Sequence, residues 1–310
     1  MKITRWEFLK SIAGIAYLFA SRGALSDPLG LPLGIQLMTI RNDLSSNFAG
    51  TLRKLSAMGY RQVEAHIVPR TGQVDYNGGT PGEFRKMLND TGLEISSCHF
   101  ATPKDDSDWA RSIEAAHTLG LEYMVCSEPW PPLDASEAKP AGTQSLETWK
   151  RIANFLNHLG TLCQRSGIEF AYHNHNAEYR IYDGVVAYDE LLRSTDPALV
   201  KMEMDCFWIT FAGKDPVSYL QKYPGRIPLL HLKDLKPGFK PTTGDFEPRL
   251  RSGKDNPFCE VGSGTIDWKR IFEAAKGGGL KYYFVEQDMW DRPSLESAAM
   301  SAAYLKKLQV

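Results

Sequence analysis

The sequence predicts an α/β protein, a single-domain (β/α)8 (TIM) barrel over residues 27–310 that follows a separate N-terminal segment, residues 1–26. Three observations lead to this fold class. Short apolar runs alternate with helical stretches, the runs number eight, and 310 residues suffice for one such domain. The runs are LGIQLM (33–38), RQVEAH (61–66), EISSCHF (94–100), EYMVCS (122–127), IEFAYH (168–173), VKMEMD (200–205), IPLLHL (227–232) and KYYFVE (281–286).

The runs have the length and composition of strands that are buried on both faces. Most are rich in Val, Ile, Phe or Tyr, and several follow a glycine that can end a helix, as Gly59, Gly92, Gly120 and Gly167 do. Strands that alternate with helices form parallel sheets, and eight of them close into a barrel. An open doubly wound sheet is the alternative, but no GxGxxG loop follows the first run.

The segments between the runs carry helical signals. Residues 144–166 place apolar side chains such as Leu146 and Trp149 at helical spacing. Residues 267–276 begin with Asp267, a plausible N-cap.

Two longer segments read as inserted loops after the fourth and seventh strands. They are the Pro-rich residues 128–142 and residues 236–258. Both would lie at the C-terminal mouth of the barrel, where loops of this fold form binding sites.

The composition is that of an ordinary globular domain. Formal net charge is −1, from 36 Lys and Arg against 37 Asp and Glu, which does not favour binding to nucleic acid. The five cysteines are widely spaced without a CxxC pair, so we expect buried thiols rather than disulfides or a zinc–thiolate site.

Residues 1–26 have the order of a bacterial export signal. Lys2, Arg5 and Lys10 surround the start, an apolar run follows, and small residues come next. The segment resembles a twin-arginine leader, with Trp6 where the second arginine would stand. We therefore expect an exported, periplasmic protein. An inner-membrane anchor, or an amphipathic helix on a cytoplasmic protein, stays open, and no later segment approaches the ~20 apolar residues of a membrane span.

Polar side chains gather at the last positions of successive predicted strands. Each alone is usually a helix cap or a hydrogen-bonded core residue, but together they would meet at one mouth. Because side chains alternate along a strand, His173 and His175 should point the same way. The residues concerned are Glu64, His66, His99, His173, His175, Glu203, Asp205, His231, Lys233, Asp234, Glu286, Gln287 and Asp288.

This pattern predicts a site for one divalent metal ion. Burying Asp205 and Glu286 together without a cation would cost several kcal/mol per ion. Two carboxylates with one or two imidazoles suit Mn²⁺, Co²⁺, Zn²⁺ or Mg²⁺. Such an ion can polarise a carbonyl and stabilise the enediolate that forms when the adjacent carbon loses a proton. Glu64, His175 and Lys233 are the candidate proton carriers.

Six pieces of sequence carry a family resemblance: GYRQVEAH, YHNHNAEY, MDCFWITFAGKDP, RIPLLHLKD, EVGSGTIDWKRIF and YYFVEQD. With these in order, the whole chain after the leader resembles the xylose-isomerase-like TIM barrel superfamily, the sugar phosphate isomerases and epimerases, in a subgroup with a YHNH motif. The resemblance implies metal ligands from strands 5 to 8, which correspond here to His173, Asp205, His231 and Glu286. His173 stands where the family usually has Glu.

The resemblance also implies roles in catalysis and substrate binding. Epimerases of this superfamily use the strand-5 and strand-8 glutamates to transfer protons on opposite faces of the substrate, and only Glu286 matches in type. Where the family often has a substrate-binding His, this chain has Trp208, a plausible apolar wall under a sugar ring. We expect His99 and Gln287 to contact the substrate as well.

Two reactions stay open. The first is a metal-dependent isomerase or epimerase of a sugar, and the second is a lyase or hydrolase of 3-keto sugars or glycosides, which the YHNH subgroup also resembles. A non-catalytic sugar-binding barrel and a DNA-repair nuclease are less favoured. We expect a small sugar or glycoside as the binding partner, with a homo-oligomer left open. Gly262-x-Gly264 weakly suggests a phosphate-binding loop, although a plain turn is commoner.

Overall fold

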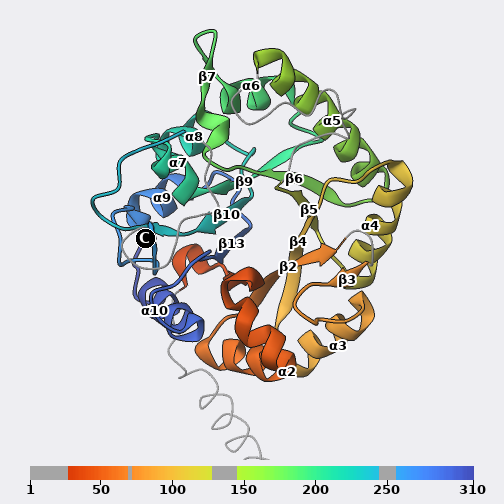
Figure 1. The fold of residues 1–310 in the computed structure, drawn as a ribbon, viewed down its shortest axis with the longest axis vertical. Helices are drawn as coiled ribbons and strands as arrows, with labels where there is room; N and C mark the ends of the chain where they lie inside the picture. Colours follow the sequence, from red (N-terminus) through yellow and green to blue (C-terminus); the bar gives the residue numbers. More distant parts are fainter. Residues whose placement is uncertain (1–26, 69–71, 128–144, 244–255) are drawn as a thin grey trace, which may run out of the picture.

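The computed structural model describes residues 27–68, 72–127, 145–243 and 256–310, which form a closed parallel β-barrel surrounded by helices (Figure 1). The eight barrel strands pair in the order β1-β2-β4-β5-β6-β9-β10-β13, and β13 pairs back with β1. The predicted fold class is confirmed, and each predicted run overlaps one barrel strand, with β2 extending two residues beyond its run. The strands are β1 (Leu33–Gln36), β2 (Gln62–Val68), β4 (Glu94–Phe100), β5 (Tyr123–Cys126), β6 (Glu169–His173), β9 (Lys201–Asp205), β10 (Leu229–Leu232) and β13 (Tyr282–Val285).

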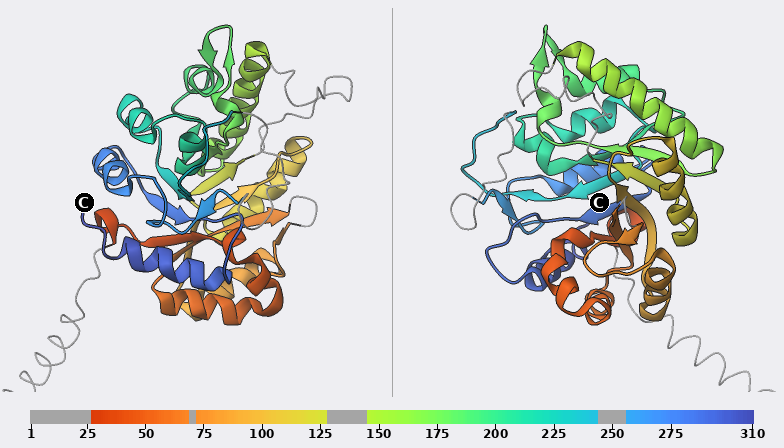
Figure 2. Two further views of the ribbon diagram at one scale, coloured as in Figure 1. Left: turned by 60° about the vertical axis from the view of Figure 1, so that its left-hand side comes forward. Right: turned by 45° about the vertical axis from the view of Figure 1, so that its right-hand side comes forward.

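Helices follow the strands along the chain and lie around the outside of the barrel (Figures 1 and 2). This is the arrangement that right-handed strand–helix–strand crossovers produce. The helices are α2 (Arg41–Met58), α3 (Pro81–Thr91), α4 (Asp106–Leu119), α5 (Leu146–Arg165), α6 (Ala187–Ser194), α7 (Cys206–Phe211), α8 (Pro216–Lys222), α9 (Trp268–Ala275) and α10 (Ser294–Leu305).

The ends of the helices follow the predicted signals. Asp267 caps α9 by accepting a hydrogen bond from the Arg270 amide, and α5 occupies most of the segment predicted from its periodicity. Gly59 ends α2 in the left-handed region at φ 98°, a conformation that favours glycine.

Short elements extend the barrel strands at their C-terminal ends. Strand β3 (Gln73–Val74) pairs antiparallel with the end of β2, and β7 (Ile181–Tyr182) forms a hairpin with β8 (Val185–Val186). Strand β11 (Asp234–Leu235) follows β10 directly and pairs with β12 (Phe258–Cys259). The η2 turn (Leu37–Ile40) follows β1, and the short turns η1 (Pro28–Gly30) and η3 (Ala177–Tyr179) complete the elements.

Two predicted segments fall wholly or partly outside the described residues. The loop 128–142 lies outside them, and so does the central part of 236–258. The leader, residues 1–26, also lies outside, so export stays a prediction. Within the described ranges, no helix combines the length and apolarity that crossing a membrane requires.

The core has two parts. Most buried apolar side chains lie in one large cluster that includes side chains of both the strands and the helices. A small separate cluster comprises Tyr123, Val125, Ala171, Leu229 and Phe284 on four barrel strands. The ring of Phe284 lies 6.1 Å from that of His231, so this cluster reaches the polar site at the mouth. The five cysteines are free and buried, as expected.

Candidate metal centre

Eight buried polar side chains from six barrel strands or their immediate ends meet at the C-terminal end of the barrel. The strands run parallel, so their ends open onto the same mouth, and residues two apart on a strand face the same side. The side chains are Glu64 (β2), His99 (β4), His173 (β6), Glu203 and Asp205 (β9), His231 (β10), Lys233 after β10, and Glu286 after β13.

The four residues predicted to bind the metal ion lie together, and we call them the outer group: His173, Asp205, His231 and Glu286. One ligand atom from each lies within 4.8 Å of the others. His173 Nε2 is 3.7 Å from Asp205 Oδ2, and His231 Nδ1 is 2.8 Å from Glu286 Oε2. The structure therefore brings together side chains whose sequence positions span more than a hundred residues.

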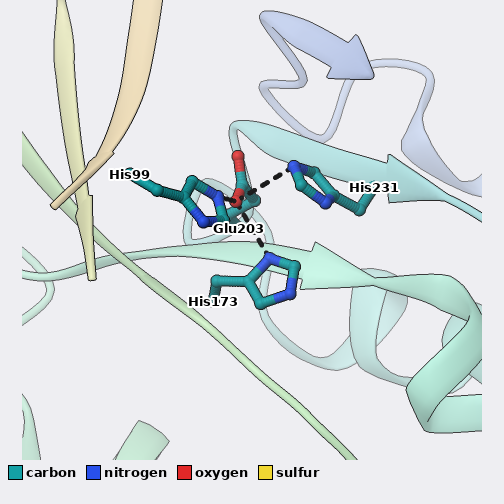
Figure 3. Close-up of side chains that lie close together, drawn as sticks. All are labelled: His99, His173, Glu203 and His231. Carbon is teal, nitrogen blue, oxygen red and sulfur yellow. Dashed lines mark hydrogen bonds and ion pairs between the residues drawn. The ribbon is translucent and has the colours of Figure 1, made fainter. Parts of the chain in front are cut away.

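A second set, the inner group, comprises His99, His173, Glu203 and His231 (Figure 3). Glu203 Oε2 lies 2.7 Å from His99 Nε2, 2.9 Å from His173 Nδ1 and 3.3 Å from His231 Nε2. Glu203 was predicted to lie at a strand end, but no role was predicted for it. The available signal was its spacing, because Glu203 and Asp205 are two apart on β9 and face the same side.

Glu64 supports the inner group. It is fully buried, and its carboxylate accepts hydrogen bonds from the side chains of Gln36 and Ser97. Glu64 Oε2 lies 2.6 Å from His231 Nε2 and 3.1 Å from His99 Nε2. This predicted proton carrier thus contacts protein groups on several sides, which suits a residue that orients its neighbours.

Lys233 lies beside the outer group. Its ammonium is 3.1 Å from Asp205 Oδ2, 2.6 Å from Glu286 Oε2 and 3.2 Å from Asp288 Oδ2. Burial lowers the pKa of Lys233, but these carboxylates outweigh burial and hold the pKa well above its usual value. Lys233 is therefore a proton donor or a fixed positive charge. No role was predicted from the sequence for Asp288, which lies beside Lys233, or for Glu203.

Mutual electrostatics set the charges of the inner group. Burial lowers the pKa of His99, but the Glu64 and Glu203 carboxylates outweigh it and raise the pKa to about 10. Burial and the charge of Glu64 raise the pKa of Glu203 to about 7. By contrast, the Lys233 ammonium and His231 outweigh burial at Glu286 and hold its pKa well below the usual range.

The donor set fits a divalent cation. Asp205 Oδ2 and Glu203 Oε1 are buried, and neither accepts a hydrogen bond from the described part of the chain. Carboxylate oxygens and imidazole nitrogens are ligands for Mn²⁺, Co²⁺, Zn²⁺ and, through oxygen, Mg²⁺. The outer group, with two carboxylates and two imidazoles, could hold such an ion.

His175 and Trp208 lie next to the outer group. The His175 ring is 5.1 Å from that of His173 and 5.5 Å from that of Trp208, so the two histidines share a side, as their spacing predicts. Burial and the Lys233 ammonium lower the pKa of His175 to about 3. Its imidazole is thus neutral at neutral pH.

The remaining predicted substrate contacts are His99 and Gln287. His99, a member of the inner group, lies between Glu64 and Glu203. The Gln287 side chain donates to the carbonyl of Met289 and lines a small cavity of about 240 Å³ beside Lys236 and Asp291. Their contact with substrate stays a prediction.

The loop with Gly262 and Gly264 is organised around Asp234. The amides of Gly262 and Ile266 donate to its carboxylate, as does the indole N–H of Trp268. A Cβ at Gly264 would collide with the same carboxylate. The two glycines therefore serve a turn around a buried aspartate, the commoner of the two interpretations.

The sequence of this chain is similar to that of proteins in one known family. Residues 52–308 match the xylose isomerase-like TIM barrel family. The chain belongs to this family. An inosose dehydratase from Bacillus cereus is 28% identical over 222 residues, which cover 66% of this chain and 73% of the relative.

Two solved structures from Parabacteroides distasonis, each described as a sugar phosphate isomerase/epimerase, have the same fold. One is 26% identical with a TM-score of 0.73, covering 89% of this chain and 94% of the other. The second is 25% identical with a TM-score of 0.70, covering 90% and 99%. The chain is thus a member of an enzyme family that contains isomerases or epimerases and dehydratases.

Proposed function

We propose that this protein is a divalent-metal-dependent isomerase or epimerase of a sugar, which removes a proton from the carbon next to a carbonyl and returns it at a different position or face. The observation that carries the proposal is the close placement of a neutral imidazole, His175, beside the four ligand residues of the outer group.

The outer group would hold the ion. His173, Asp205, His231 and Glu286 supply two imidazoles and two carboxylates. A divalent ion bound there would supply a Lewis acid that polarises the carbonyl oxygen and stabilises negative charge on it. The family membership and the buried, under-bonded oxygen Asp205 Oδ2 support this assignment.

The protein's own groups would move the proton. His175 would accept it from the carbon next to the carbonyl, and the electron pair of the broken C–H bond would pass to the carbonyl oxygen. The same imidazolium, or a second group such as Lys233 or Glu286, would return a proton to carbon. Trp208 would provide an apolar wall against which a sugar ring can pack.

A lyase or dehydratase is the second candidate, and Lys233 is the observation that favours it. Its ammonium stays protonated beside Asp205 and Glu286. After proton removal by His175, a hydroxyl or sugar oxygen could leave the next carbon with its electron pair and take a proton from Lys233. A relative named inosose dehydratase supports this alternative.

The substrate we propose is an unphosphorylated sugar or glycoside. The leader-like residues 1–26 support it, because an exported enzyme meets free sugars more readily than sugar phosphates. Fractionation of the producing cell, with N-terminal sequencing of the mature protein, checks this. A full-length protein confined to the cytoplasm would contradict export.

Deuterium exchange tests the reaction. We expect the purified protein, incubated in D₂O with a panel of free ketoses and 3-keto glycosides, to place deuterium next to the carbonyl, as followed by NMR. His175→Ala should slow this exchange by about 100-fold or more, the usual contribution of a positioned base. Release of water or an aglycone would identify the lyase, whereas exchange with rearrangement alone would identify the isomerase or epimerase.

His117→Ala is the matched control, because His117 is an exposed histidine in the last turn of α4. It should exchange at the wild-type rate. If His175→Ala also exchanges at that rate, His175 is not the base. If the wild-type protein exchanges no substrate of the panel, the proposed reaction fails.

A further inference from the structure

Two imidazoles of the site each face carboxylates on both sides. His173 directs Nδ1 to Glu203 Oε2 at 2.9 Å and Nε2 toward Asp205 Oδ2 at 3.7 Å. His231 directs Nε2 to Glu64 Oε2 at 2.6 Å and Nδ1 to Glu286 Oε2 at 2.8 Å. An imidazole that binds a metal ion is neutral and has one N–H and one lone pair. Only one side of each ring can therefore face a metal ion, and the other side donates a hydrogen bond.

The distances distinguish the two sides of His173. At 2.9 Å, the contact to Glu203 has the length of a hydrogen bond. At 3.7 Å, the contact to Asp205 is too long for one. Two ligands about 2.1 Å from a shared ion lie roughly 3.0–3.4 Å apart, so a small shift of either side chain would let both bind one ion.

Three of the four oxygens of the inner carboxylates already contact hydrogen-bonding groups, and Glu203 Oε1 accepts no hydrogen bond from the described residues. Glu64 accepts from Gln36 and Ser97, and Glu203 Oε2 also faces His99 Nε2 at 2.7 Å. In the outer group, Asp205 Oδ2 accepts no hydrogen bond from the described residues and lies 3.1 Å from the Lys233 ammonium. The contact between His231 Nδ1 and Glu286 has hydrogen-bond length, and an ion bound to both would take the place of the shared proton.

We propose that Glu203 and Glu64, joined through His99, are positioning residues that orient His173 and His231 toward a metal ion in the outer group. We call them the inner carboxylate pair. This proposal rests on the proposed function. In it, His173 donates an N–H···O hydrogen bond from Nδ1 to Glu203, and His231 donates one from Nε2 to Glu64. Each carboxylate thereby directs the opposite nitrogen's lone pair at the ion and makes that nitrogen a stronger ligand. Groups in such positions typically change metal affinity about 10- to 100-fold.

Metal titration separates this inference from its alternative, an ion held by the inner group itself. Metal-free protein would be titrated with Co²⁺, following binding by the visible absorption spectrum. We expect Glu203→Gln to bind one Co²⁺ with about 10- to 100-fold weaker affinity, because the amide oxygen still accepts an N–H but carries no charge. Asp205→Asn should lose binding almost completely. Glu190→Gln, which alters a buried carboxylate on α6, is the matched control and should titrate like wild type.

Three outcomes would overturn the inference. Wild-type Co²⁺ affinity in Glu203→Gln together with loss in Asp205→Asn would defeat it while leaving the proposed metal site intact. Loss of binding in Glu203→Gln with retention in Asp205→Asn would place the ion in the inner group. Absence of Co²⁺ binding by the wild-type protein would defeat the proposed metal site as well.

A measurement on the wild-type protein keeps the inference testable if a variant does not fold. X-ray absorption of the zinc-loaded protein counts imidazole ligands. The outer group provides two, His173 and His231, whereas the inner group provides three. Two imidazoles with additional oxygen ligands are expected, and three would overturn the proposal.

Discussion

Two buried aspartates near the ends of neighbouring strands have opposite surroundings. Asp205 ends β9 and Asp234 begins β11, and both are fully buried. Asp234 accepts hydrogen bonds on both oxygens, and its donors among the described residues are neutral. Its donors are the amides of Leu235, Gly262 and Ile266 and the indole of Trp268, at 2.8–3.1 Å.

Asp205 has far fewer hydrogen bonds. Its Oδ1 accepts one from the Trp208 amide at 3.0 Å. Its Oδ2 accepts none from the part of the chain that the structure describes, although the Lys233 ammonium lies 3.1 Å away. A buried carboxylate with a full set of donors holds the backbone around it, whereas one with an unused oxygen is available to a cation or a substrate. Asp234 thus stabilises the loop around it, whereas we propose that Asp205 binds the metal ion.

The largest expected effect is loss of stability at the fully bonded aspartate. Asp234→Ala would leave several buried N–H groups without an acceptor, so the free energy of unfolding should fall by about 4 kcal/mol. Denaturant unfolding of the metal-free protein measures this. A loss below about 1 kcal/mol would remove the contrast between the two aspartates.

The next effect concerns metal binding at Asp205. Asp205→Ala should weaken binding by at least about 100-fold, or about 2.7 kcal/mol. In EDTA its free energy of unfolding should stay within about 1 kcal/mol of wild type, because Lys233 keeps Glu286 and Asp288 as charged partners when the Asp205 carboxylate is removed. Metal analysis after dialysis and unfolding curves measure the two quantities. Equal metal content in variant and wild type would exclude Asp205 as a ligand.

The smallest effect is expected at a helix end away from both aspartates. Thr80 and Glu83 form a capping box at the start of α3, with hydrogen bonds in both directions. Thr80→Ala should lower the free energy of unfolding by about 1 kcal/mol and leave metal affinity unchanged. Thermal and denaturant unfolding check the first part, and Co²⁺ titration checks the second. A loss as large as that of Asp234→Ala would show that the aspartate is not exceptional.

Much of the fold could be predicted because its signals are local. Strand length, apolar content and helix-ending glycines such as Gly59 depend on nearby residues alone. The spacing of His173 and His175 likewise determined that they share a side, since alternation along a strand is a property of the backbone. The same alternation predicts that the adjacent residues Lys233 and Asp234 face different sides. Lys233 contacts Glu286, whereas Asp234 accepts a hydrogen bond from the Trp268 indole.

The sequence by itself determined the barrel, the order of its strands and the set of polar residues that reach its mouth. The tertiary structure decided which of them touch, and at what depth. Glu203 and Asp205 look alike in the sequence, but the inner one meets three imidazoles and the outer one meets Lys233. Strand tilt and stagger around a closed barrel set these heights, and they arise only when all eight strands pair. Closure of the barrel therefore also determines which ring nitrogen of His173 or His231 faces which carboxylate.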